Sequence, residues 1–139
     1  MHGSTLRRRR GLHVSAAVAA SVTIIAGAAA CGGGSSVSSS PAGVVSTLFS
    51  DIQANNCDGA FAQLSSRLQS QLSGRTGVCP FVTQLSVRYR DNKFHVDSVR
   101  TNGNQATVKS TRTNRNGTSV SATVITVVDK NAWKVDSLG

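Results

Sequence analysis

The sequence predicts an α+β domain, with N-terminal helices packed on a curved four-stranded antiparallel meander, a cone-like arrangement. Two observations indicate this class. Apolar residues recur at helical spacing over residues 41–85, whereas from Lys93 onward they alternate with polar residues. Turn sequences at residues 102–103, 116–117 and 129–131 then separate four alternating segments. Helices followed by a run of hairpin-connected strands are the order typical of α+β domains.

The first helix is expected to begin at Ser40-Pro41. Ser caps helix N-termini well, and Pro is tolerated in the first turn. Asn55-Asn56 is expected to end this helix. The side chains of its apolar stripe are Val45, Leu48, Phe49 and Ile52.

Two further helices are expected before the strands. One is predicted to begin near Asp58 and to end at Ser73-Gly74. A third, short helix is expected after Cys79-Pro80. The inward residues of the second helix are Phe61, Leu64, Leu68 and Leu72. Those of the third are Val78, Phe81, Val82 and Leu85.

The strands are expected to present one inward row each, because alternate side chains of a strand share a face. The first two rows are Phe94, Val96 and Ser98, and then Ala106, Val108 and Ser110. The last two rows are Val120, Ala122, Val124, Thr126 and Val128, and then Trp133, Val135 and Ser137.

The N-terminal segment has the pattern of an export signal. Arg7–Arg10 is a charged start, and Val14–Ala30 is uncharged, too short and too rich in Ala for a permanent membrane span. The stretch Ala26-Gly27-Ala28-Ala29-Ala30-Cys31 resembles the lipobox of bacterial lipoproteins, and the Gly/Ser run after it is similar to the tether of actinobacterial envelope lipoproteins. It departs from that pattern at Ala28, where a Leu-like residue is usual.

The lipobox resemblance implies cleavage before Cys31 and a diacylglyceryl thioether on its sulfur. Two or more acyl chains hold a protein stably on a membrane. The chain then divides into a signal peptide (1–30), a tether (31–40) and a domain (41–139), and the tether reaches roughly 17 Å as a flexible coil. Plain secretion, an uncleaved anchor and export through the twin-arginine route stay open as alternatives.

The cysteine count supports the same division. The chain has three cysteines, and an exported domain lies where disulfides persist. With Cys31 carrying the lipid, Cys57 and Cys79 are expected to form a disulfide. If the protein were simply secreted, Cys31 would instead be an exposed odd thiol.

The charge of the chain is basic but modest once the signal is removed. Fifteen Lys and Arg face six Asp and no Glu, for a formal charge of +9. Removing Arg7–Arg10 leaves eleven against six, or +5. Such a surface is attracted to anionic membranes or wall polymers. No nucleic acid partner is predicted, because the basic residues are scattered and no aromatic run interleaves them.

Three segments carry a family pattern: Asn56-Cys57-Asp58-Gly59-Ala60-Phe61, the hairpin over residues 102–108, and the terminal Trp133-Lys134-Val135-Asp136-Ser137-Leu138. They resemble nuclear-transport-factor-two-like (ketosteroid-isomerase-like) cones, and in particular small envelope lipoproteins of that superfamily. The resemblance covers about residues 41–139. It implies the cone fold but not the function, because this fold hosts enzymes, binding proteins and assembly partners. It also implies a homodimer through the sheet face as one arrangement.

The residues that support chemistry are few. His2 and His13 leave with the signal, so His95 is the one histidine of the domain. The resemblance implies an Asp or His base facing a Tyr, and Tyr89, Asp97 and His95 are the available set. Tyr89 is expected in the exposed helix-to-strand link. We predict no catalytic residue, no metal site and no cofactor.

The sequence therefore favours a non-enzymatic envelope protein of binding or accessory type. It is expected to be lipid-anchored on the extracytoplasmic face of the cell membrane, or secreted if Cys31 is not lipidated. Its partner would be a small apolar ligand between helices and sheet, or a membrane protein. Two alternatives stay open: an isomerase- or cyclase-like enzyme using Asp97 or His95 in the cone, and a structural protein that contacts anionic wall polymer.

Overall fold

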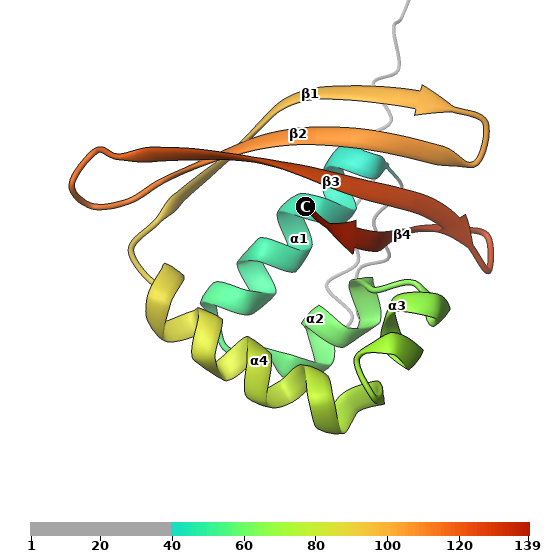
Figure 1. The fold of residues 1–139 in the computed structure, drawn as a ribbon, viewed down its shortest axis with the longest axis horizontal. Helices are drawn as coiled ribbons and strands as arrows, with labels where there is room; N and C mark the ends of the chain where they lie inside the picture. Colours follow the sequence, from blue (N-terminus) through green and yellow to red (C-terminus); the bar gives the residue numbers. More distant parts are fainter. Residues whose placement is uncertain (1–39) are drawn as a thin grey trace, which may run out of the picture. The chain divides into compact units, whose positions relative to one another are not determined.

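The computed structural model describes residues 40–139, which hold all the helices and strands discussed below (Figure 1). The predicted signal peptide, Cys31 and the tether as far as residue 39 lie outside the described residues. The helices are α1 (Pro41–Gln53), α2 (Cys57–Gln63), α3 (Ser66–Gln71) and α4 (Gly74–Tyr89). No helix among residues 40–139 combines the length and the apolar character needed to cross a membrane.

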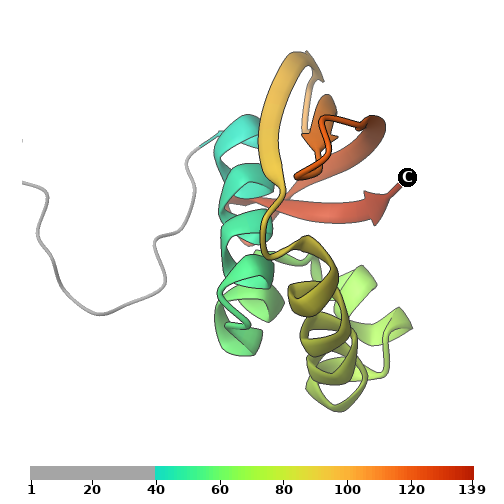
Figure 2. The ribbon, with the colours of Figure 1, turned by 90° about the vertical axis from the view of Figure 1, so that its left-hand side faces the viewer.

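Four strands follow the helices: β1 (Lys93–Asn102), β2 (Gln105–Thr113), β3 (Ser119–Asp129) and β4 (Ala132–Leu138). They form one antiparallel sheet in the order β1-β2-β3-β4. The sheet is curved, and α1 lies along one of its faces (Figures 1 and 2). The predicted α+β class and the predicted meander are thus confirmed.

The core lies between α1 and the sheet and continues to α4. The predicted start of α1 is correct, because the Ser40 hydroxyl accepts a hydrogen bond from the Gly43 amide at 3.1 Å. The stripe of α1 packs with Val108, Val124 and Val135, each from a predicted inward row of the sheet. The prediction that Ser137 also faces inward is wrong, because the register of β4 shifts before it and Leu138 instead pairs with buried Val124. The buried apolar side chains of this core include Val44, Val45, Leu48, Ile52, Val78, Val82, Val108, Val124 and Val135.

The single second helix predicted from Asp58 to Gly74 is wrong, because the chain breaks it into α2 and α3. Leu64 is extended and forms a parallel bridge with Val135 of β4. The Ser65 amide donates to the Val135 carbonyl at 2.7 Å, and the Ser65 hydroxyl caps α3 by accepting from Leu68 N at 3.1 Å. The edge of β4 therefore pairs with the backbone of Leu64 and Ser65, whose groups would otherwise be bonded within a continuous helix.

The third helix begins earlier than predicted, at Gly74 rather than after Pro80. Ser73 and Gly74 have φ angles of 60° and 66°, and these left-handed conformations reverse the chain between α3 and α4. Pro80 lies inside α4, where it removes one helical donor. Buried Val78 and Val82 on either side pack this helix against the core in spite of that loss.

The predicted inward row of β1 holds only in its first half. The pairing register of β1 with β2 shifts between Val96 and Ser98, so Asp97 is an extra residue on this edge strand, a β-bulge. Phe94 and Val96 are half-buried against the core, whereas Ser98 is exposed. After the bulge the inward position passes from Ser98 to Val99, which pairs with buried Val108 of β2.

Candidate binding cleft

One open cleft lies where the C-terminal end of α4 faces the β2–β3 hairpin, and its volume is about 330 Å³. Three segments of the chain contribute to it: the end of α4 with the turn after it, the end of β2, and the start of β3. The lining residues are Arg88, Tyr89, Asn92, Arg112, Asn114, Thr118 and Val120. Arg112 continues the inward row of β2 after buried Ser110, so the cleft lies on the helix side of the sheet.

The guanidinium of Arg112 lies on the ring of Tyr89, with its carbon 4.1 Å from the ring centre. The Tyr89 ring is in turn 6.5 Å from Phe49 of α1, and Phe49 stacks on Phe94 of β1 at 3.9 Å. An aromatic column rooted in the core thus fixes the position of Arg112. The prediction that Tyr89 lies in an exposed link is wrong: Tyr89 is the last residue of α4 and is half-buried.

The carbonyl groups near the cleft are already occupied. The side-chain amide of Gln53 donates to the backbone carbonyls of Tyr89 and Asn92, at 3.0 and 2.6 Å. The side-chain oxygen of Asn114 accepts from the amides of Asn116 and Thr118, at 3.0 and 2.9 Å, and so shapes the β2–β3 turn. The Asn114 amide nitrogen, which only donates, is left for the cleft.

The two arginines of the cleft have no carboxylate partner among residues 40–139. The ion pairs of this part of the chain join Arg67 to Asp136, Arg75 to Asp58, and Arg115 to Asp91. The last pair, at 3.5 Å, connects the two turns that border the cleft. The positive charges of Arg88 and Arg112 are therefore not neutralised within the described domain.

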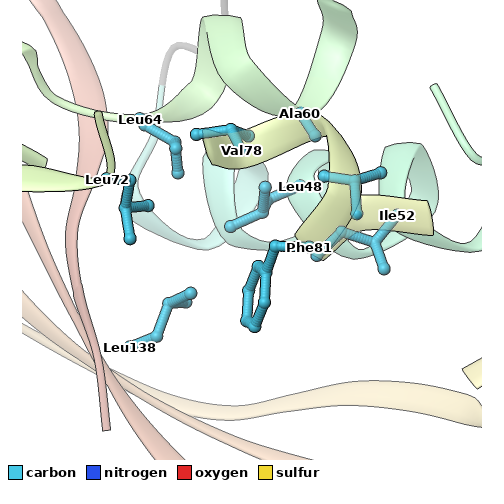
Figure 3. A pocket seen from close by; sticks show the side chains of 9 residues that line it. Leu48, Ile52, Ala60, Leu64, Leu72, Val78, Phe81 and Leu138 are labelled. Atoms are coloured by element: carbon cyan, nitrogen blue, oxygen red, sulfur yellow. The ribbon is translucent and has the colours of Figure 1, made fainter. Parts of the chain in front are cut away.

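The space in which a small apolar ligand was predicted is nearly filled (Figure 3). Between α1, α2, α4 and the end of β4 lies an apolar cavity of about 10 Å³, which is barely enough space to admit one water. Figure 3 shows Leu138 reaching this cavity from the sheet while Phe81 and Leu72 approach from the helices. Phe81 and Leu138 are 42% and 41% exposed, so the cavity lies just beneath the surface.

The candidate catalytic residues are not brought together. His95 and Asp97 are exposed on the outer face of the sheet, where the Asp97 carboxylate accepts from the Thr111 hydroxyl at 2.7 Å. Tyr89 lies on the opposite, helix-covered side beneath Arg112. Neither His95 nor Asp97 lines the cleft, and the described residues contain no cluster of three metal-ligating side chains.

The predicted disulfide between Cys57 and Cys79 is present, with 5.1 Å between the two Cα atoms. It joins the first residue of α2 to the middle of α4. Cys79 precedes Tyr89 by ten residues and neither cysteine lines the cleft, so the bridge holds the helices together.

A polar contact away from the cleft connects β4 to α3 and to the residue that caps it. The Asp136 carboxylate accepts from the Ser65 hydroxyl at 2.5 Å and from the Arg67 guanidinium at 2.6 Å. The Arg67 hydrogen bonds lower the pKa of Asp136, and the Ser66 backbone amide, which donates to Asp129, lowers the pKa of Asp129. Burial instead raises the pKa of Asp51 in α1.

These shifts predict that acid destabilises the domain. A carboxyl with a lowered folded pKa adds stability above its unfolded pKa, about 3.9 for Asp, and loses it as the pH falls through the folded pKa. Asp51 acts in the opposite direction. We expect Asp136→Asn to lower the free energy of unfolding by about 1–2 kcal/mol at pH 7. Urea unfolding at pH 7 and pH 3 checks this, and an unaltered pH dependence in the variant contradicts it.

Comparison with known proteins supports the fold. No model of a known protein family matches the chain, and no curated protein matches it. An NTF2-like protein of Campylobacter jejuni whose name proposes a transpeptidase superimposes with a TM-score of 0.53 at 12% identity, over 67% of this chain and 94% of that one. A protein of Thiobacillus denitrificans whose name proposes a calcium/calmodulin-dependent protein kinase type II association domain gives 0.53 at 14% identity, over 71% and 91%.

These similarities define the class of fold. The helices followed by a curved four-stranded meander form an NTF2-like α+β domain, as the resemblance of the sequence predicted. At such identities the likeness concerns the fold alone, and any activity of this chain has to be argued from its own residues.

Proposed function

We propose that the protein is a lipid-anchored, non-enzymatic envelope protein whose NTF2-like domain binds a ligand in the cleft at the end of α4. The observation that carries this proposal is the lining of the cleft. About 330 Å³ of space is bordered by arginine, amide and hydroxyl donors, with a tyrosine and a valine beside them. Polar groups converging on a space of this size are typical of ligand sites.

Binding is favoured over catalysis because the cleft lacks an acid–base pair. General acid–base chemistry needs a carboxyl, imidazole or similar group within reach of the substrate. No Asp or His lines the cleft, and the ring of its tyrosine is covered by Arg112. The isomerase-like alternative requires Asp97 or His95 in the cone, and both side chains lie on the other face of the sheet.

The anchor is tested on the native protein. Mass spectrometry of the membrane fraction is expected to find an N-terminal Cys31 that carries a diacylglyceryl group. A Cys31→Ser variant is the matched control, and it should leave the membrane fraction. An unmodified Cys31 on wild-type protein in the medium contradicts the anchor and supports plain secretion.

The cleft is tested by filling it. Val120 lines the cleft and is 50% exposed, whereas Val87, 70% exposed on α4, does not line it. We expect native mass spectrometry of protein purified from its own membranes to detect a bound small molecule in the wild type and in Val87→Trp. The same molecule should be absent from Val120→Trp. Equal retention by both variants places the ligand elsewhere.

A further inference from the structure

We infer that the ligand of the cleft is a small organic oxyanion, a carboxylate or a phosphate monoester attached to an apolar group. This inference rests on the proposed binding function and names the chemistry of its ligand. The oxyanion would lie against Arg112 and Arg88, and the apolar part against Val120.

Hydrogen-bond donors outnumber acceptors in the cleft. The backbone carbonyls of Tyr89 and Asn92 are held by Gln53, and the side-chain oxygen of Asn114 is held by the β2–β3 turn. The groups that remain are two guanidinium groups, the Asn114 amide nitrogen, the Asn92 side-chain amide, and the hydroxyls of Tyr89 and Thr118. Because the two guanidinium groups only donate and carry positive charge, a ligand whose oxygens accept hydrogen bonds, as those of carboxylate and phosphate do, matches this set best.

Arg112 is held in place by the Tyr89 ring. Its guanidinium lies 4.1 Å from the centre of the Tyr89 ring, and this ring is supported by Phe49. Stacking on the ring holds one face of the planar guanidinium group but leaves the N–H groups at its edge available for a ligand. The side-chain entropy of Arg112 is therefore largely lost before binding, which favours affinity for an anion.

The surroundings of the cleft are positively charged. Five basic residues occupy the segments that border the cleft, against one acidic residue, Asp91. The basic residues are Arg88, Arg90, Lys93, Arg112 and Arg115. Asp91 pairs with Arg115. The remaining charges create a positive potential that attracts anions to this end of the domain.

Val120 forms an apolar wall of the cleft. Val120 is the cross-strand partner of Arg112 and is 50% exposed within the cleft. An apolar group next to the oxyanion would cover this side chain and remove its surface from water. The volume of about 330 Å³ lies at the low end of ligand pockets, which favours a small molecule over a polymer.

The position of the cleft favours a soluble ligand over a lipid of the anchoring bilayer. The folded domain begins at Ser40, at the N-terminal end of α1, whereas Gln53 holds the cleft from the opposite end. α1 has 13 residues and therefore spans about 20 Å. A domain tethered through residue 40 carries the cleft at its end remote from the tether.

The inference is tested by calorimetric titration of the mature protein with phenyl phosphate and benzoate, using benzyl alcohol as the neutral probe. We expect both anions to bind and benzyl alcohol to bind at least about tenfold more weakly, because charge-assisted hydrogen bonds are lost. Arg112→Ala and Arg88→Ala should each weaken anion binding by about tenfold. Arg100→Ala, on exposed β1 away from the cleft, removes the same charge and should leave binding unchanged.

Two further measurements test the geometry of the Arg112 contact and the source of the ligand. Arg112→Lys retains the charge and, if the planar guanidinium group matters, should still lose most of the anion affinity even where Arg112→Ala fails to fold. Vesicles containing phosphatidic acid present the same phosphate monoester on a bilayer. If the protein binds these vesicles more tightly than it binds phenyl phosphate, the ligand is a lipid and not a soluble molecule. Equal binding of anions and benzyl alcohol contradicts the oxyanion inference. If the wild type instead binds a neutral ligand that Val120→Trp does not bind, the oxyanion inference is wrong but the proposed binding function holds.

Discussion

Replacing Cys57 and Cys79 together with Ser is expected to lower the free energy of unfolding by about 3 kcal/mol. The bridge closes a loop with a sequence separation of 22, and it restricts the unfolded chain accordingly. It also holds α2, a helix of seven residues that is too short to be stable alone, against α4. Urea unfolding followed by circular dichroism measures this loss.

Reductant provides the matched control for this prediction. Wild-type protein in excess reductant should unfold at the same urea concentration as the double variant, and the double variant should not respond to reductant. If wild type and double variant unfold at the same urea concentration without reductant, the bridge does not stabilise the domain. A single Cys57→Ser variant should expose the Cys79 thiol to labelling, whereas the folded wild type should leave that thiol unlabelled.

The meander was readable from sequence because strand pairing and turn chemistry are local. Gly103 and Gly117 have φ angles of 58° and 82°, which the Asn-Gly turns predict. Lys130 and Asn131 adopt the same left-handed region in the last turn. Alternation then assigns the inward rows of β2 and β3 correctly, because one face of each strand is buried. It fails at the end of β4, where the register shift at Asp136 brings Leu138 rather than Ser137 to the inner face.

The helical half was less readable because distant backbone groups decide where its helices end. The spacing of Phe61, Leu64 and Leu68 is helical, yet Leu64 and Ser65 pair with β4. No local signal shows that Val135, about seventy residues later, offers this edge. Pro80 is equally ambiguous, because it is typical of helix starts but is tolerated here by packing on both sides.

The cleft was missed because its lining comes from segments that only the fold brings together. His95 and Asp97 were candidate catalytic residues because of their residue types. Their alternation with Phe94 and Val96 already indicates that they lie on the outer face of the sheet. One signal did point to the cleft. Arg112 follows Ala106, Val108 and Ser110 in the inward row of β2, and an arginine at such a position calls for a partner. That partner, Tyr89, is identifiable only once α4 is placed.

Replacing Gly77 with Ala is expected to lower the free energy of unfolding by about 2–3 kcal/mol. In an unobstructed helix the same change stabilises by up to about 1 kcal/mol, so the surroundings decide its sign. A Cβ on Gly77 would lie closer than 3.0 Å to the backbone carbonyl of Leu72, which cannot rotate away as a side chain does. The variant must therefore shift the first turn of α4 away from the end of α3.

Thr83→Ala, at an exposed position of the same helix, is the matched control, and we expect it to be neutral or stabilising by a few tenths of a kcal/mol. Because Gly77 lies two residues from Cys79, the shifted turn should also strain the packing around the disulfide. Thermal unfolding of the two variants beside wild type distinguishes close approach from helix propensity. If Gly77→Ala raises the melting temperature as Thr83→Ala does, propensity governs this turn and the contact with Leu72 does not constrain it.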